Sequence, residues 1–266
     1  MRNYYCYIRV GILNSLEYRV NFFIELLNSF FPIIVQFFVW SAVYGSITEQ
    51  VINGFTFQEL ILYIIVASLV SKVLAPGIED EISNDIRNGG LNTYLVRPVS
   101  YFKSKIFTAF GTKAIHILIC MPVMLIIYIG LSLLWQMPIS IFQILLFFVS
   151  ISLALVLNCC LFFCLSLIAF WTTQTWGIMI AFRIVINILS GGVLPLSMLG
   201  NFIDAISVFL PFRYILGFSI DILQGNCSGI EILYGFSIQF ISIALILLIT
   251  NWVWRKGQKK YMAVGG

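Results

Sequence analysis

Few side chains in this sequence have the type and spacing that chemistry requires. His116 is the only histidine, so a metal site built from several histidines is excluded and any histidine-dependent catalytic pair would rest on this residue. Cys159, Cys160 and Cys164 have no histidine or acidic residue near them in sequence, and such cysteines behave as small apolar side chains. The phosphate-binding pattern of a glycine, four residues and Gly-Lys-Ser/Thr does not occur. We therefore predict no catalytic, cofactor-binding or metal-binding residue, and no ATP hydrolysis by this chain alone.

Charged side chains are sparse throughout the chain. Of 266 residues, 61% are hydrophobic and 10% are charged, and the mean hydropathy is +1.01. Because a soluble domain carries about 25% charged residues, this composition indicates an integral membrane protein. The carboxylates inside apolar segments are Glu25 and Glu59, both close to an end of their segment, whereas ion-coupled carriers normally place ionisable groups at mid-membrane. The energy for transport must come from elsewhere, or the protein is a passive pore.

Six apolar segments are long enough to cross a bilayer, whose hydrocarbon core needs about 20 helical residues. They cover residues 22–43, 57–74, 114–135, 141–170, 176–196 and 232–254. Continuous apolar segments favour helices over barrel strands, because lipid cannot satisfy free backbone polar groups. We predict one all-α domain over residues 1–266 with six transmembrane helices.

Lysine and arginine are distributed unevenly about these segments. All except Arg213 fall on the side that carries both termini and the 75–105 connection. The excess of positive charge places this side in the cytoplasm of a multi-pass protein of the cell membrane, and it places the 197–231 connection outside. No basic block suits nucleic acid. Arg183 falls within the fifth segment, where its stem could reach the inner interface or its head could contact a substrate.

Residues 1–21 show an amphipathic pattern before the first apolar segment. Tyr5, Ile8, Ile12, Leu16 and Val20 recur at three- and four-residue spacing. The pattern predicts a helix lying in the inner interface, and an ordinary lead-in to the first span is an equal alternative.

The 197–231 connection contains one short apolar stretch, residues 201–210, which ends at Pro211. Ten residues form a helix of about 15 Å, too short to cross the bilayer. We predict a re-entrant element that enters from outside and returns.

The connection after the second segment carries a helical pattern of its own. Ile78, Ile82 and Ile86 repeat every four residues among acidic side chains, and Gly89 and Gly90 end the pattern. Such a helix could present its apolar ridge to the groove of a soluble partner. The same pattern is also compatible with a solvent-exposed connector that binds no partner.

Three parts of the sequence resemble the ABC-2 type six-helix permease family. RNGGLNTYLVRPVSYF at 87–102 resembles its signature, in which a glycine, a leucine pair and Arg-Pro follow the second span. The two Gly residues and Pro195 of 191–195 are similar to its outer loop, and LPFRYILGFSIDILQG at 210–225 and WRKGQKKYMAVGG at 254–266 are similar to its C-terminal part. The resemblance covers nearly the whole chain. It implies a membrane subunit of an ABC exporter, paired with two copies of a separate ATPase that binds ATP and Mg, and with an identical or related second permease.

The resemblance also implies roles for four groups of residues. The helix between spans two and three would contact the ATPase, through Glu79, Asp80, Glu81, Ile82, Asp85, Ile86, Arg87, Gly89, Gly90, Arg97 and Pro98. A second, smaller contact would involve Thr172, Thr173, Gln174 and Thr175. Helices two and five would line the pathway, with Val66, Ser68, Leu69, Phe182, Ile186 and Leu189 as candidates. The outer element would act as a lid, with Phe202, Val208 and Pro211 as gate residues.

Three functions thus compete. The first is the transporter subunit, in which an apolar, aromatic-rich seam between two permease subunits suits an amphipathic, peptide-like or lipid-like cargo. An intramembrane enzyme would depend on His116 or a cysteine and would need no partner. A pore, or an immunity protein that sequesters a membrane-active peptide, would also need no ATPase. An ATPase gene beside this one would favour the transporter.

Overall fold

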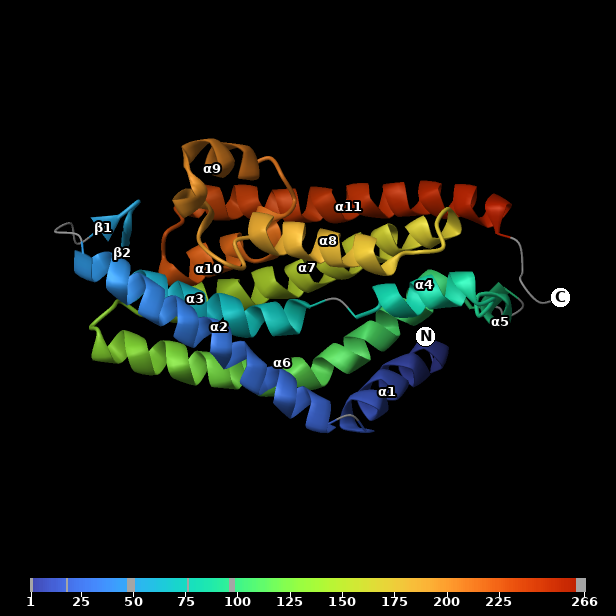
Figure 1. The fold of residues 1–266 in the computed structure, drawn as a ribbon, viewed down its shortest axis with the longest axis horizontal. Coiled ribbons are helices and arrows are strands. Elements are labelled where there is room, and N and C mark those ends of the chain that lie inside the picture. Colours follow the sequence, from blue (N-terminus) through green and yellow to red (C-terminus); the bar gives the residue numbers. More distant parts are fainter. Residues whose placement is uncertain (1, 18, 47–50, 76, 96–98, 262–266) are drawn as a thin grey trace.

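The computed structural model describes residues 2–17, 19–46, 51–75, 77–95 and 99–261. In these ranges the protein is an elongated bundle of long helices that run along a common direction (Figure 1). The α-helices are α1 Arg2–Glu17, α2 Arg19–Ser46, α3 Phe57–Leu74, α4 Glu79–Arg87, α5 Asn92–Leu95, α6 Tyr101–Leu134, α7 Ile141–Ser166, α8 Trp176–Leu189, α9 Asn201–Ser207, α10 Gly217–Gln224 and α11 Gly229–Lys260. Two short strands, β1 Val51–Ile52 and β2 Phe55–Thr56, form an antiparallel hairpin, and three 3-10 turns are η1 Leu167–Phe170, η2 Leu196–Leu199 and η3 Arg213–Ile215.

The all-α membrane architecture predicted from the sequence is confirmed. Among the described residues, five helical segments are long and apolar enough to cross a membrane, and they fall on α2, α3, α6, α7 and α11. The fifth predicted segment differs, because α8 has only 14 residues. At 1.5 Å per residue it measures about 21 Å, shorter than a hydrocarbon core of about 30 Å. The sixth full span therefore stays a prediction.

The end of α8 coincides with a glycine turn that α3 holds in place. Gly191 adopts the left-handed φ of 80°, which side chains other than glycine rarely adopt. Its carbonyl oxygen accepts a hydrogen bond of 2.8 Å from the Tyr63 hydroxyl of α3. At Gly192 a Cβ atom would collide with the Asn187 side chain. The chain therefore leaves the helix at this point, inside a segment that is apolar throughout.

Helix α3 forms the centre of the bundle. It has the predicted bounds, and its start is fixed by a capping box in which Thr56 and Glu59 bond each other's backbone N–H groups. It contacts α2, α6, α7 and α10, and nearly all its side chains from Leu60 to Leu74 are buried. The second apolar segment is thus enclosed by protein rather than by lipid.

Helix α1 packs along the first half of α6 (Figure 1). Gly11 and Gly111 lie at the contact, where a Cβ on either would collide with backbone of the other helix. Small residues let two helices approach closely. Tyr5 and Leu16 of α1 stay exposed. The position of this helix in the membrane interface stays a prediction.

The sequence predicted a re-entrant element in residues 201–210, but the short helix that is buried in the bundle is the following one, α10. Residues 201–210 contain α9, and Phe202 there is 78% exposed. The following α10 is buried against α3 and α7 instead. Its polar groups are satisfied inside the bundle: Ser219 bonds Ser150 at 2.7 Å, and Tyr128 donates to the Leu223 carbonyl at 2.9 Å. A short helix can be buried at this depth because protein supplies these partners.

Candidate functional site

Helix α4 carries a group of charged side chains at one end of the described bundle. Figure 1 shows α4, α5, the start of α1 and the end of α11 together, and we call this the α4 end. The β-hairpin and α10 lie toward the opposite end, the hairpin end.

Helix α4 forms as the sequence pattern predicts. Glu79, Asp80 and Glu81 occupy its first turn, where carboxylates interact favourably with the helix dipole. Gly89 follows the helix with a left-handed φ of 79°. At Gly90 a Cβ would lie 2.8 Å from a carboxylate oxygen of Asp85, so the chain turns back closely against the helix.

The apolar ridge of α4 faces the chain's own bundle. Ile82 is 0% exposed, and Ile78 and Ile86 are almost as deeply buried. They share a cluster with side chains of α6, α7 and η1, among them Tyr101, Phe163 and Leu167. This differs from the expectation that the ridge enters the groove of a partner. The reason is that the bundle itself forms the groove into which the ridge packs. The spacing of isoleucines in the sequence shows that one face of the helix is apolar, but it does not show which surface covers that face.

An ion-pair group ties the start of α4 to α8. The Arg183 side chain donates from Nε to Glu79 Oε1 at 2.7 Å and from Nη2 to Asp80 Oδ2 at 2.8 Å. Glu79 is 0% exposed, and the Arg183 side chain is 39% exposed. Sequence reasoning gave Arg183 to the membrane interface or to a substrate and missed this role. No local signal could have found it, because the partners lie more than a hundred residues apart.

A second ion-pair group ties the middle of α4 to α6. Lys105, only 3% exposed, contacts Glu81 and lies 2.6 Å from Asp85 Oδ2. The Tyr101 hydroxyl donates to the same Asp85 oxygen at 2.8 Å. The Lys105 ammonium also lies 5.4 Å from the ring centroid of Tyr94, within cation–π distance. In the sequence Lys105 is only one of the basic residues on its side of the membrane, and no local signal predicts its buried contacts, because Glu81 and Asp85 are 20 or more positions away.

The outward face of α4 remains polar and open. Asp80 and Glu81 are each about half exposed, and Asn84, Arg87 and Asn88 are exposed. The turn after η1 contributes Thr173 and Gln174, also exposed, whereas Thr172 is half-buried and Thr175 is buried. Because η1 contacts α4, this turn lies at the same end of the bundle. Arg97 and Pro98 lie outside the described residues.

A family model described as ABC-2 family transporter protein matches residues 30–265. The chain belongs to the ABC-2 transporter family. No curated protein and no solved structure matches it. ABC-2 permeases are membrane components of transporters, not enzymes by themselves, and they normally work with an ABC ATPase. The resemblance in the sequence is thereby confirmed.

The pathway candidates of this ABC-2 chain separate into two groups. Val66, Leu69 and Ile186 are buried within the chain itself. Ser68, Phe182 and Leu189 are half-buried. Val66 and Leu69 contribute to the packed core around α3, and Ile186 lines a cavity that we consider below. Their role in a pathway stays a prediction.

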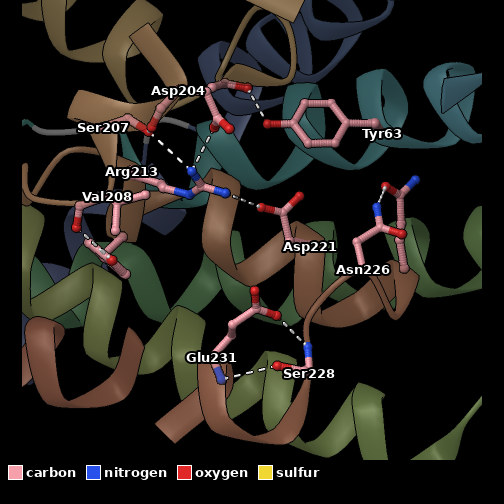
Figure 2. A network of polar contacts seen from close by, with 12 residues as sticks. Tyr63, Asp204, Ser207, Val208, Arg213, Asp221, Asn226, Ser228 and Glu231 are labelled. Carbon is pink, nitrogen blue, oxygen red and sulfur yellow. Dashed lines mark hydrogen bonds and ion pairs between the residues drawn. The ribbon is translucent and has the colours of Figure 1, made fainter. Parts of the chain in front are cut away.

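A polar network holds the hairpin end of the ABC-2 chain. Figure 2 shows Arg213 between Asp204 and Asp221, with bonds of 2.7 Å from Nη1 to Asp204 and 3.5 Å from Nη2 to Asp221. Arg213 Nη1 also donates to Ser207 Oγ at 3.1 Å. The network joins α9 to η3 and α10. Arg213, the one basic residue predicted to lie on the outer side, therefore has a structural role here.

The three gate candidates lie around this network. The backbone carbonyl of Val208 accepts a bond of 2.8 Å from the Tyr214 hydroxyl. The side chains of Val208 and Pro211 are half-buried, while Phe202 points away from the packed core. A lid function for this segment stays a prediction.

Proposed function

We propose that this chain is the permease subunit of an ATP-driven ABC exporter and that α4 is the element through which a separate ATPase acts on it. The observation that carries the proposal is the attachment of α4: two ion-pair groups and an apolar ridge fix it to the bundle, while its polar face stays open. The cargo class that suits an apolar seam is amphipathic, peptide-like or lipid-like. The complex would contain two ATPase copies and a second permease, identical or related.

The attachment gives the coupling a physical form. Closure of two ATPase subunits on ATP would displace α4. Arg183 connects α4 to α8, Lys105 connects it to α6, and the ridge around Ile82 connects it to α7 and η1. A displacement of α4 would therefore move these helices together, as expected for a rigid-body switch.

The alternative of an intramembrane enzyme is less well supported. His116 Nδ1 lies 3.1 Å from the Thr112 carbonyl oxygen, one turn earlier in its own helix. Cys159 and Cys160 are buried in the apolar core. These placements favour packing roles. A pore or an immunity protein would have no ATPase partner. Co-purification of an ATPase, as tested below, therefore separates these alternatives from the transporter.

We predict that the exposed face of α4 contacts the ATPase, and a bulky side chain there tests it. Asn84→Trp should reduce co-purification of the ATPase at least about tenfold, the equivalent of roughly 1.4 kcal/mol, because it holds the two surfaces apart. Asn226→Trp, the same change at an exposed position of the hairpin end, is the matched control. Equal ATPase recovery from both variants and the parent would remove α4 as the contact.

The orientation of the chain is tested with a membrane-impermeant thiol reagent. Cys227 is a poor reporter, because burial, with Asp221 and Glu231 nearby, raises the pKa of its thiol to about 12. We therefore use Asn226→Cys, exposed in the same loop, in a Cys227→Ser background. Intact cells should label Asn226→Cys and spare the exposed Cys6 until they are permeabilised. Labelling of Cys6 alone in intact cells would reverse the topology.

A further inference from the structure

A cavity of about 290 Å³ lies between α3, α7 and α8, with η3 beside it. We call it the α3–α7–α8 cavity. Much of its wall is apolar, formed by side chains such as Leu74, Phe162, Ile186 and Leu216. Ser71 of α3 and Asn158 of α7 also line it.

These two polar side chains are incompletely bonded. Asn158 is 4% exposed, and its Nδ2 donates to the Leu74 carbonyl in the last turn of α3. Its Oδ1 is buried and has no hydrogen-bond partner among the described residues, and the same holds for Ser71 Oγ. Buried polar atoms are nearly always bonded, because leaving one unpaired is unfavourable. Both residues line the apolar cavity, so a molecule bound there would supply the missing bonds.

The chemistry of the two atoms restricts that molecule. Asn158 Oδ1 can only accept a hydrogen bond, whereas the Ser71 hydroxyl can donate one. A hydroxyl group satisfies both, because it donates to the amide oxygen and accepts from serine. An unprotonated carboxylate has no hydrogen for Asn158. An ammonium group could donate to both oxygens, but no carboxylate among the described lining residues would neutralise its charge in this apolar cavity.

The charge of the cavity points the same way. Arg183 lines it, but its guanidinium is already paired with Glu79 and Asp80 of α4. An anion would therefore meet no uncompensated positive charge there. The wall thus favours a neutral ligand.

We propose that the α3–α7–α8 cavity binds the hydroxyl-bearing end of a neutral, largely aliphatic molecule. This goes beyond the proposed function, because binding here needs no ATPase. The volume lies at the small end of the range for ligand sites, so a medium-length alcohol fits it. Arg183 both lines the cavity and holds α4, so the ligand and the docked helix share one side chain.

The test uses the purified full chain in phosphatidylcholine nanodiscs and a photoreactive aliphatic diazirine alcohol of about eight carbons, a size that suits a small apolar site. Mass spectrometry should locate the label on residues that line the cavity. Excess 1-octanol should displace it, whereas octyl methyl ether, which has no hydrogen to donate, should not. Asn158→Leu should reduce the labelling about fivefold, as expected for one lost hydrogen bond.

Asn158→Leu also removes the bond to Leu74, so a second variant leaves the polar atoms intact. Ile186→Trp places bulk into the cavity and should abolish the labelling, while Val185→Trp, at an exposed position of α8 that does not line the cavity, should leave it unchanged. The proposal is overturned if the label appears only on exposed side chains such as those of α2 and α11. It is also overturned if alcohol and ether compete equally and Asn158→Leu labels as the parent does, since the label would then bind without hydrogen bonds to the cavity's polar side chains.

Discussion

Replacing Arg183 with alanine is expected to release the start of α4 from α8. The change leaves Glu79, which is 0% exposed, as an unpaired buried carboxylate. Breaking a buried pair costs about 3 to 5 kcal/mol, and we expect about 3 because Arg183 is partly exposed and its charge is screened by solvent. Amide hydrogen exchange in α4 should accelerate about a hundredfold, which corresponds to this free energy. Hydrogen-exchange mass spectrometry of the purified ABC-2 chain measures it.

Two further variants separate charge from packing. Arg183→Lys keeps the charge but lacks the planar guanidinium that donates to Glu79 and Asp80 at once. The exchange rate of α4 in this variant should therefore lie between those of the parent and the alanine variant. Arg183→Leu combined with Glu79→Gln removes both charges, and the double variant should recover most of the protection, because no buried charge is left unpaired. If the double variant exchanges as fast as Arg183→Ala, the ion pair is not what holds α4.

Ile82→Asp is expected to undock α4 altogether. Ile82 is 0% exposed and packs against side chains of α6, α7 and η1. The change removes its apolar contact and places a carboxylate in that cluster, at a cost of about 4 kcal/mol or more. Exchange in α4 should rise roughly a thousandfold, which corresponds to that cost, and the complex with the ATPase should be lost because its docking face is no longer held.

The measurement on the isolated chain decides between two explanations. If the ridge packs on its own bundle, exchange in α4 rises without any ATPase present. If the ridge instead enters a groove of the partner, the isolated chain stays protected and only the complex is lost. Asn84→Asp is the matched control, because it adds the same charge to the exposed face of the same helix and should leave exchange unchanged.

Features that depend on neighbouring residues could be predicted from the sequence. Apolar composition identified a membrane protein, and an uninterrupted apolar segment gave the bounds of α3. The isoleucine spacing and the glycines at 89 and 90 predicted α4 and its end, because a helical period and a left-handed turn are properties of neighbouring residues. Motifs spread along the chain indicated the family that the match to residues 30–265 confirms.

The partners that these elements contact follow from the packing of the whole bundle and could not be predicted from the sequence. The sequence identified the apolar ridge of α4 but not the groove that covers it, which is formed by α6, α7 and η1. Arg183 pairs with Glu79 across 104 positions, and Asn158 reaches the Leu74 carbonyl across 84. The early end of α8 and the burial of α10 likewise depend on Tyr63 and Ser150 of other helices. A hydrogen bond or ion pair needs its two atoms within a few ångströms, and segments so distant along the chain come that close only when the whole bundle has packed.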